Sequence, residues 1–233
     1  MFSRIYHFLK GPNPLHPSVW EGRLPSLSFR RLADTDTDGC LELYRLNEPG
    51  RFPPDTVGMY EKSIREQTSY FVVAEQEHQI IASGGLSYFG RENIAVFCFG
   101  LVHPDHQDKG LGTALFLARL ALLNPKRRTY RVVIAAVEKS IGFYERFGFR
   151  KATPWKDLHN EKHPSGYLDV TAREIRQCRA LLREHRIIVP DDEDRIPFRK
   201  APQPEAYQLL CHSCGETIEA TDDFCKKCGY RLW

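Results

Sequence analysis

Two glycines stand between an apolar strand and an apolar helix, an order that can present backbone N–H groups to an anion. The run from Ile94 to Val102 is apolar, and the run from Thr113 to Leu123 is apolar without a helix breaker. Between them, Gly110 and Gly112 lack a Cβ atom, so backbone N–H groups can turn inward toward phosphate oxygens. The dipole of the following helix adds roughly half a positive charge at the same end. This turn is a candidate phosphate site.

Two common phosphate loops do not fit this turn. A Walker loop needs Lys and then Ser or Thr after its last glycine, but Gly112 is followed directly by Thr113. A dinucleotide-binding loop needs Gly or Ala three residues after its second glycine, where this chain has Leu115. The pattern that does fit is Q-x-x-G-x-G, from Gln107 to Gly112, preceded by V-x-P.

A second motif follows at a fixed distance along the chain. Asn124 and Pro125 end the apolar helix, and Tyr130 to Ala136 has the composition of a short buried strand. The next segment, S-I-G-F-Y-E-R-F-G-F, carries Tyr144 on a short helix that ends at a glycine. An aromatic pair on such a helix is by itself more often core packing than catalysis. The order of the two motifs is what gives Tyr144 a possible chemical role.

Together, Q-x-x-G-x-G and F-Y-E-x-x-G-F resemble the GNAT superfamily of acyl-CoA-dependent N-acyltransferases over about residues 27–170. The resemblance implies acetyl-CoA as co-substrate, with its pyrophosphate on the amides of the glycine turn and its pantetheine arm beside the preceding strand. The coenzyme-binding residues it implies are Leu101, Val102, His103, Gln107, Asp108, Lys109, Gly110, Leu111, Gly112 and Thr113. It also implies that the two helices after the first strand, and the loop between these helices, wall the acceptor pocket.

Chemistry at such a site needs an acid and a base. The resemblance makes Tyr144 the acid that protonates the departing thiolate, while a backbone N–H near Val102 would polarise the thioester carbonyl. The attacking amine must be neutral, so a base or a water chain is required. Glu92, Glu138 and His103 are weak candidates for that base, each more simply read as a loop residue.

Two classes of function follow. The first is an N-acetyltransferase that moves acetyl from acetyl-CoA directly to a primary amine of a small molecule or protein within a ternary complex. The alternative is a non-catalytic acyl-CoA-binding regulatory or adaptor protein that recruits a protein or nucleic-acid partner. GNAT members often carry a carboxylate on the fourth or fifth strand, whereas the stretches 97–102 and 130–136 of this chain carry none. The absence of this carboxylate favours the alternative, as does Val137, where many GNAT members have Asn. A net charge of +3 argues against nucleic acid as a partner.

Four cysteines at the C-terminus have the spacing of metal ligands. C-x-x-C recurs ten residues after its first copy, which places two pairs of thiolates in tight turns that a glycine follows: Cys211, Cys214, Cys225 and Cys228. Four thiolates complete a closed, tetrahedral, structural Zn²⁺ site similar to a zinc ribbon. A redox C-x-x-C would need no second pair. Because so short a segment buries little core, metal binding should supply its folding energy.

Composition sets the compartment and the size. The 233 residues, 42% hydrophobic and 27% charged, are typical of a globular domain with a small appendage. No window reaches the ~20 apolar residues of a membrane span, and the first ten residues lack a signal-peptide core. With no secretory signal, reduced thiolates favour a cytoplasmic location.

The elements that position these residues predict a mixed α/β domain. Strands are expected over 27–32, 70–75, 80–88, 94–102, 130–136, 149–155 and 166–170, and helices over 37–46, 55–67, 113–123 and 171–186. D-T-D-T-D-G, from Asp34 to Gly39, imitates a calcium loop, but its twelfth position is Arg45, so it reads instead as a helix start. The fold class is a GNAT-like mixed, mostly antiparallel sheet flanked by helices, plus a small zinc ribbon.

The domain boundaries follow from composition. Residues 1–26 are expected to form a proline-rich arm, residues 27–188 the GNAT-like acetyltransferase domain, residues 189–208 a linker, and residues 209–233 the zinc ribbon. Thr171 and Glu174 form a capping box for the extra helix of residues 171–186. Its apolar stripe could pack against the sheet or against the second subunit of a homodimer.

Overall fold

A computed structural model describes most of the chain. The described residues are 15, 24–48, 52, 56–156, 162–199, 209–211, 213–214, 216–218, 222 and 224–230, with only the backbone at 91–92, 138, 151–156, 162–164, 209–210 and 217. Most of the expected N-terminal arm (residues 1–26) and the centre of the polar loop before residue 162 therefore lie outside the described residues.

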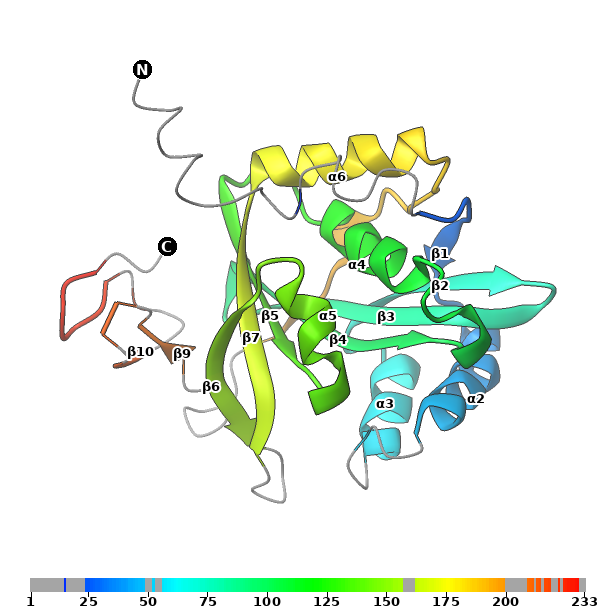
Figure 1. The fold of residues 1–233 in the computed structure, drawn as a ribbon, viewed down its shortest axis with the longest axis horizontal. Coiled ribbons are helices and arrows are strands. Elements are labelled where there is room, and N and C mark those ends of the chain that lie inside the picture. Colours follow the sequence, from blue (N-terminus) through cyan, green and yellow to red (C-terminus); the bar gives the residue numbers. More distant parts are fainter. Residues whose placement is uncertain are drawn as a thin grey trace.

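The elements follow the predicted order (Figure 1). They are β1 (Phe29–Arg31), α2 (Thr37–Asn47), α3 (Thr56–Arg65), β2 (Tyr70–Gln76), β3 (Gln79–Phe89), β4 (Arg91–Val102), α4 (Leu111–Ala121), β5 (Thr129–Ala135), α5 (Ile141–Glu145), β6 (Arg150–Lys156), β7 (Lys162–Thr171), α6 (Ala172–Glu184), β8 (Phe198–Arg199), β9 (Leu209–Leu210) and β10 (Thr217–Ile218).

The strands form one large mixed sheet. Within the described part of the chain, eight strands pair in the order β1-β2-β3-β4-β5-β7-β6, with β8 added to β3. The pairs β4–β5 and β3–β8 are parallel, and the others are antiparallel. The prediction of a mixed, mostly antiparallel sheet is confirmed.

Helices cover both faces of this sheet (Figure 1). α4 and α6 lie on one face, whereas α2 and α3 lie on the other. The alternation along β2 explains the two cores, because Val72 and Ala74 join the α4 side while Phe71 and Val73 join the α2 side. A sheet buried on both faces must be apolar at consecutive positions, as β2 is.

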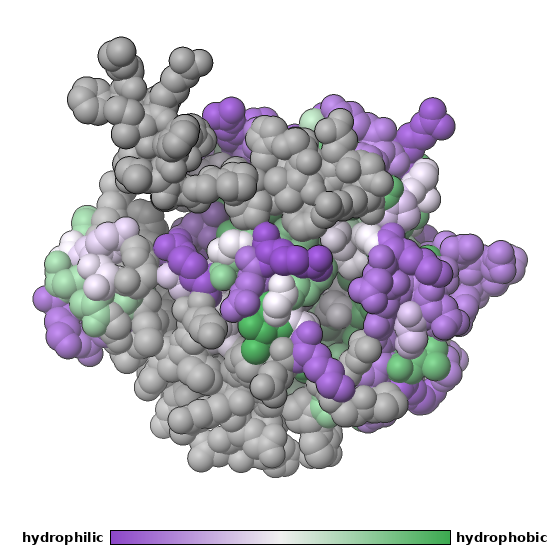
Figure 2. Space-filling view, in the orientation of Figure 1, coloured by the Kyte–Doolittle hydropathy of each residue, from purple (hydrophilic) through white to green (hydrophobic). Residues whose placement is uncertain are grey.

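The extra helix α6 packs on α4 within the same chain. Its capping box forms, with Thr171 Oγ1 accepting from the Glu174 N–H at 3.3 Å and the Glu174 carboxylate accepting from the Thr171 N–H at 2.7 Å. The apolar stripe of α6, which consists of Ile175, Cys178, Leu181 and Leu182, is buried. Arg179 donates to the carbonyls of Ala121 and Leu123 at the end of α4. The outer side of α6 is hydrophilic (Figure 2).

The segment after α6 differs from the expected linker. Residues 187–199 run along the sheet: the Phe29 N–H donates to the Ile188 carbonyl, and the Tyr88 N–H donates to the Pro197 carbonyl. Ile187 and Ile196 are buried, and the Tyr70 hydroxyl donates to the Asp192 carboxylate at 2.7 Å. Prolines and charges predicted a solvated chain, but the apolar residues between them complete the edge of the sheet. Of the expected linker, only residues 200–208 lie outside the described residues.

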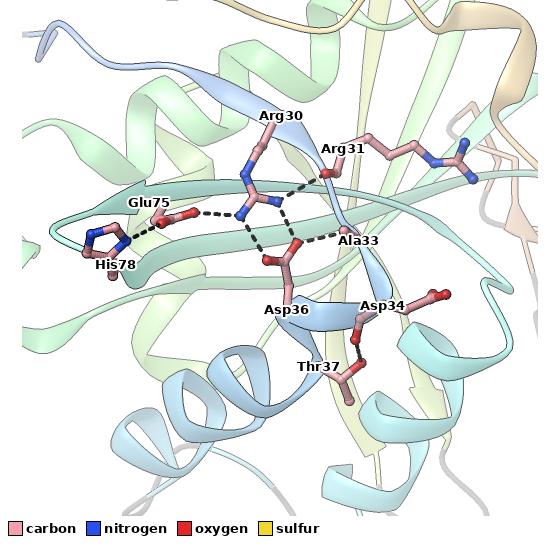
Figure 3. Close-up of polar contacts among 8 residues, drawn as sticks. All are labelled: Arg30, Arg31, Ala33, Asp34, Asp36, Thr37, Glu75 and His78. Atoms are coloured by element: carbon pink, nitrogen blue, oxygen red, sulfur yellow. Dashed lines mark hydrogen bonds and ion pairs between the residues drawn. The ribbon is translucent and has the colours of Figure 1, made fainter.

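The acidic run before α2 is tied down by an arginine (Figure 3). Both Asp36 oxygens accept from the Arg30 guanidinium, at 2.6 and 2.8 Å, and one also accepts from the Ala33 N–H at 2.7 Å. Arg30 donates to Glu75 of β2 as well, at 2.6 Å. The hydrogen bond from Arg30 holds the pKa of Asp36 below its usual value. This network joins β1, β2 and the start of α2.

Asp36→Asn is expected to lower the free energy of unfolding by about 1–2 kcal/mol at neutral pH, because the buried Asp36 carboxylate loses its charge-assisted hydrogen bonds to the half-exposed Arg30. A carboxylate whose folded pKa is lowered stabilises the fold above its unfolded pKa of about 3.9, and that stabilisation disappears as the pH falls through the folded pKa. Urea unfolding at pH 7 and pH 3 measures both effects. The exposed Asp38→Asn is the matched control and should change stability by under about 0.5 kcal/mol. An equal loss in both variants would contradict the role of the pair.

None of the helices in the described part of the chain is long and apolar enough to cross a membrane.

Candidate functional site

The sheet opens where β4 and β5 part. Their parallel pairing runs from Ile94 beside Arg131 to Phe97 beside Ile134 and goes no further, although β4 continues to Val102. β5 meanwhile stays paired with β7 as far as Ala135. The second half of β4 therefore has a backbone edge that faces an opening between two strands.

A β-bulge lies at the start of this opening. Ser83 pairs with Leu101 and Gly85 with Cys98, so β4 has one more residue than β3 in this interval. Phe99, within the bulge, has φ = 45°, which is rare for an aromatic residue. Its ring packs at 5.0 Å from that of Tyr60 and at 6.4 Å from that of Phe71. These contacts hold a strained backbone of the kind that gathers at functional sites.

The bulge also exchanges the faces of β4. Ala95 and Phe97 contribute to the α4-side core, whereas Leu101, which is six and four positions further in the same alternation, contributes to the α2-side core. A strand without an extra residue would keep these positions on one face. The Leu101 side chain is consequently directed away from α4, and only its backbone lies on the exposed edge.

The glycine turn begins α4 as predicted. Gly110 is the N-cap with φ = 83°, a conformation that favours glycine, and Asp108 has φ = 59°. The first N–H groups of a helix have no intrahelical partner. In the described residues, the backbone N–H groups of Leu111, Gly112 and Thr113 likewise have no acceptor. They point out of the helix end, at the mouth of the opening between β4 and β5.

Gln107 anchors the turn through its side chain. Its Nε2 atom donates to the Val102 carbonyl at 3.1 Å and to Asn47 Oδ1 at 3.2 Å. The turn is thereby fastened to the end of β4 and to α2. Asp108 and Lys109 are exposed at the apex of the turn.

Of the three candidate bases, only His103 has a side chain within the described part of the structure. His103 is 8% exposed, and its Nδ1 accepts from the Asp105 N–H at 3.2 Å, which caps the short 3₁₀ helix of Pro104–His106. Its Nε2 atom faces the Gln79 amide at 3.1 Å. The side chains of Glu92 and Glu138 lie outside the described residues.

Tyr144 lies beside the bulge. Its ring packs among Phe116, Phe143 and Phe149, with centroids 5.0–6.3 Å apart. Its hydroxyl oxygen is 3.4 Å from the position that a Cβ atom on Gly100 would take. α5 ends at Glu145, three residues before Gly148, whose φ of 82° turns the chain toward β6. Tyr144 and the glycine turn, which are far apart in sequence, thus lie along the same edge of β4.

Sequence reasoning missed Arg119. It is the one charged residue of α4, it is 2% exposed, and its guanidinium lies under the bulge, where a Cβ atom on Gly100 would be 3.1 Å from Nη2. The available signal was a single arginine in a helix that is otherwise apolar on all sides. Such a helix is buried, so the arginine that it carries is expected to be buried with it, which is uncommon for a charged residue.

The four cysteines form one cluster. Their Sγ atoms all lie within 4.8 Å of one another, and the pairs Cys211–Cys228 and Cys214–Cys225 are each 3.6 Å apart. Thiolates at ~2.3 Å from one tetrahedral ion would be about 3.8 Å apart, so the cluster fits such an ion. Cys211 directly follows β9, which pairs with β10, and the Cys211 N–H donates to the Glu216 carbonyl at 2.7 Å. Gly229 turns the second pair with φ = 70°.

Comparison with known proteins identifies both parts. Residues 67–151 match the family model described as an acetyltransferase (GNAT) domain, and residues 210–232 match the zinc-ribbon domain model. These two stretches are therefore similar to a GNAT acetyltransferase domain and to a zinc ribbon, in agreement with the sequence motifs.

Individual proteins are more distant. Glucosamine 6-phosphate N-acetyltransferase of Schizosaccharomyces pombe is 35% identical over 52 residues, which are 22% of this chain and 46% of that protein. The chain therefore spans about half the length of this curated relative. A Desulfovibrio desulfuricans structure described as of the GNAT family has a TM-score of 0.52 at 18% identity, over 63% of this chain and 99% of that one. This likeness is one of fold. The ribosomal-protein-S18-alanine N-acetyltransferase of Escherichia coli has a TM-score of 0.45 at 20% identity, over 62% and 92% of the two chains.

Proposed function

We propose that the chain is an N-acetyltransferase that moves an acetyl group from acetyl-CoA to a primary amine within a ternary complex. The observation that carries this proposal is the continuous edge of β4, which runs from the bulge beside Tyr144 to the free N–H groups of the glycine turn. The match to a GNAT acetyltransferase domain supports the same function.

The coenzyme has a natural orientation on this edge. Its pyrophosphate accepts from the N–H groups of Leu111, Gly112 and Thr113, where the helix dipole favours negative charge. Its pantetheine arm pairs with the backbone of residues 101–103, on the side of β4 that β5 leaves unpaired. The thioester then reaches the bulge, next to Gly100.

Acetyl transfer at the bulge moves one acyl group and one proton. The amine nitrogen attacks the carbonyl carbon, a C–N bond forms, the C–S bond breaks, and its electron pair goes to sulfur. A backbone N–H of the bulge polarises the carbonyl, and the Tyr144 hydroxyl donates a proton to sulfur. The amine gives up its own proton to water, and water returns a proton to the Tyr144 phenolate, so that the protons balance. The acceptor enters from the α2 and α3 side of the sheet.

The cysteine cluster completes the proposal. We propose that it binds one structural Zn²⁺ through four thiolates, with no open coordination position for chemistry. The reduced thiolates that this requires fit a cytoplasmic location.

Coenzyme binding tests the first part directly. Coenzyme A is expected to bind near 1:1, and Gly112→Glu to weaken it roughly 10- to 100-fold, because a carboxylate at the helix N-terminus repels phosphate and blocks its approach. A Cβ atom at Gly112 meets Phe143 at an ordinary 3.5 Å, so the fold should tolerate the substitution. Calorimetry gives the affinities.

Gly58→Glu is the matched control, because a Cβ atom there meets nothing within 4 Å and the residue is exposed on α3, which packs on the face of the sheet opposite α4. It should bind coenzyme A as wild type does. Wild-type affinity in folded Gly112→Glu would overturn the assignment of the glycine turn.

A further inference from the structure

The buried charge of α4 has no counter-ion among the residues that the structure describes. Arg119 is 2% exposed, and none of the carboxylates in the described residues forms an ion pair with it. Its Nε atom lies 3.4 Å from the Leu115 carbonyl, and its Nη1 atom 3.5 Å from the Cys98 carbonyl, both at the long limit of a hydrogen bond. Its guanidinium stacks 4.7 Å from the centre of the Phe97 ring. A buried guanidinium so weakly held costs several kcal/mol of desolvation.

Two glycines make the space for this guanidinium. A Cβ atom on Gly84 of β3 would be 3.1 Å from Arg119 Nε, and one on Gly100 of β4 would be 3.1 Å from Nη2. Any larger residue at either position would have to displace the arginine. The neighbouring strands are thus shaped to accept a cation at this point.

The guanidinium also lies beside the bulge of β4, where the acetyl transfer is proposed to occur. The position of a Cβ atom on Gly100 is within 3.4 Å of the Tyr144 hydroxyl and within 3.1 Å of Arg119 Nη2, so both groups flank the same point of the bulge. In the described residues, Nη2 has no hydrogen-bond acceptor. A charged donor without an acceptor, next to the group that would protonate sulfur, is complementary to an anion that forms there.

We propose that Arg119 is a further catalytic residue, which binds the coenzyme A sulfur as it becomes a thiolate. The inference rests on the proposed acetyl transfer. As the C–N bond forms and the C–S bond breaks, the electron pair of the C–S bond moves to sulfur, beside Nη2. The positive charge stabilises this thiolate until the Tyr144 proton reaches it. The charge of Arg119 thus gains an anionic partner, the sulfur, only as the transition state forms. An interaction that is stronger in the transition state than in the ground state accelerates the reaction.

The test uses Arg119→Met, which keeps the length of the side chain and removes its charge. We expect kcat to fall about 10²- to 10³-fold, as for the loss of one donor to a developing anion, while KM for acetyl-CoA changes little. A second readout needs no turnover. The ultraviolet absorbance of the thiolate in bound coenzyme A should appear at a lower pH in wild type than in Arg119→Met, because a neighbouring arginine favours the thiolate.

Two further variants keep the test independent of folding. Gly100→Ala retains the charge but places a methyl group 3.1 Å from Nη2 and 3.4 Å from the Tyr144 hydroxyl, so it should lower kcat by crowding both groups. Arg173→Met, at an exposed position on α6, is the control for removal of an arginine and should have wild-type kcat. Circular dichroism establishes that each variant is folded.

The outcomes separate the inference from the proposed function. Wild-type protein that neither binds coenzyme A nor acetylates any amine would overturn the function itself. Active wild type, with kcat and thiolate titration unchanged in Arg119→Met and Gly100→Ala, would overturn the role of Arg119 alone. A higher KM confined to acceptors that carry a carboxylate would also overturn it, since Arg119 would then bind the acceptor.

Discussion

Tyr144→Phe is expected to lower kcat about 10²- to 10⁴-fold, the usual contribution of a general acid. The substitution removes only the hydroxyl, which is directed at the bulge of β4. The ring remains among Phe116, Phe143 and Phe149, so the fold and the affinity for coenzyme A should be unchanged. Steady-state turnover with a panel of primary amines, together with calorimetry for coenzyme A, measures the two quantities.

Tyr167→Phe is the matched control for this prediction. Tyr167 lies on β7, where its ring faces Arg131 and Arg150, away from the bulge. Its kcat should equal that of wild type. If Tyr144→Phe turns over as fast as Tyr167→Phe, the thiolate leaves without a proton from Tyr144, and this residue serves only to pack the core.

Cys225→Ser should reduce bound zinc from one per chain to nearly none. Cys225 is buried, its Sγ atom lies 3.6 Å from that of Cys214, and its N–H donates to the Tyr230 carbonyl. In the described residues of the ribbon, the buried apolar core consists of Cys211, Ile218 and Cys225, which is small enough that we expect metal binding to supply most of its stability. Zinc binding of about 10–16 kcal/mol is the expected source of its folding energy. Metal analysis of protein purified under reducing conditions measures the loss.

Two comparisons sharpen this prediction. Cys178→Ser should keep its zinc and instead destabilise the acetyltransferase domain, because Cys178 is buried in α6. A chain that ends at Lys200 retains β8 and should bind coenzyme A, whereas one that ends at Arg186 loses Ile187, Ile196 and β8 and should unfold more readily. Zinc-free wild type would refute the metal site. Loss of coenzyme binding in the Lys200 chain would mean that the ribbon contributes to the acetyltransferase site.

Local signals predicted the elements that carry the site. The glycines at 110 and 112 fixed the start of α4, the capping box fixed the start of α6, and the C-x-x-C pairs fixed the cysteine cluster. In each case, neighbouring residues decide the backbone conformation. Because such signals depend only on residues close together in the chain, they can be recognised in a single sequence.

The bulge and the edge segment were not predictable in the same way. The extra residue of β4 depends on how Ser83 and Gly85 pair with it, and the φ of Phe99 is held by Tyr60 and Phe71, which lie far along the chain. Residues 187–199 were assigned to a linker because prolines and charges dominate their composition. Their placement depends instead on unpaired backbone of β1 and β3, which the sequence of the segment does not reveal.

The pairing of residues 187–199 with β1 and β3 has a consequence for synthesis on the ribosome. The Phe29 N–H donates to the Ile188 carbonyl, and Tyr88 and Phe89 pair with Phe198 and Arg199. β1 and β3 are therefore synthesised about a hundred residues or more before the segment that pairs with them. At a translation rate of about 5–20 residues per second, the end of β3 stays without this neighbour for roughly 5–20 s. Exposed strand edges attract other chains. The nascent acetyltransferase domain should therefore depend on chaperones until residue 199 emerges, and ribosome profiling of chaperone-bound chains should place their release after that point.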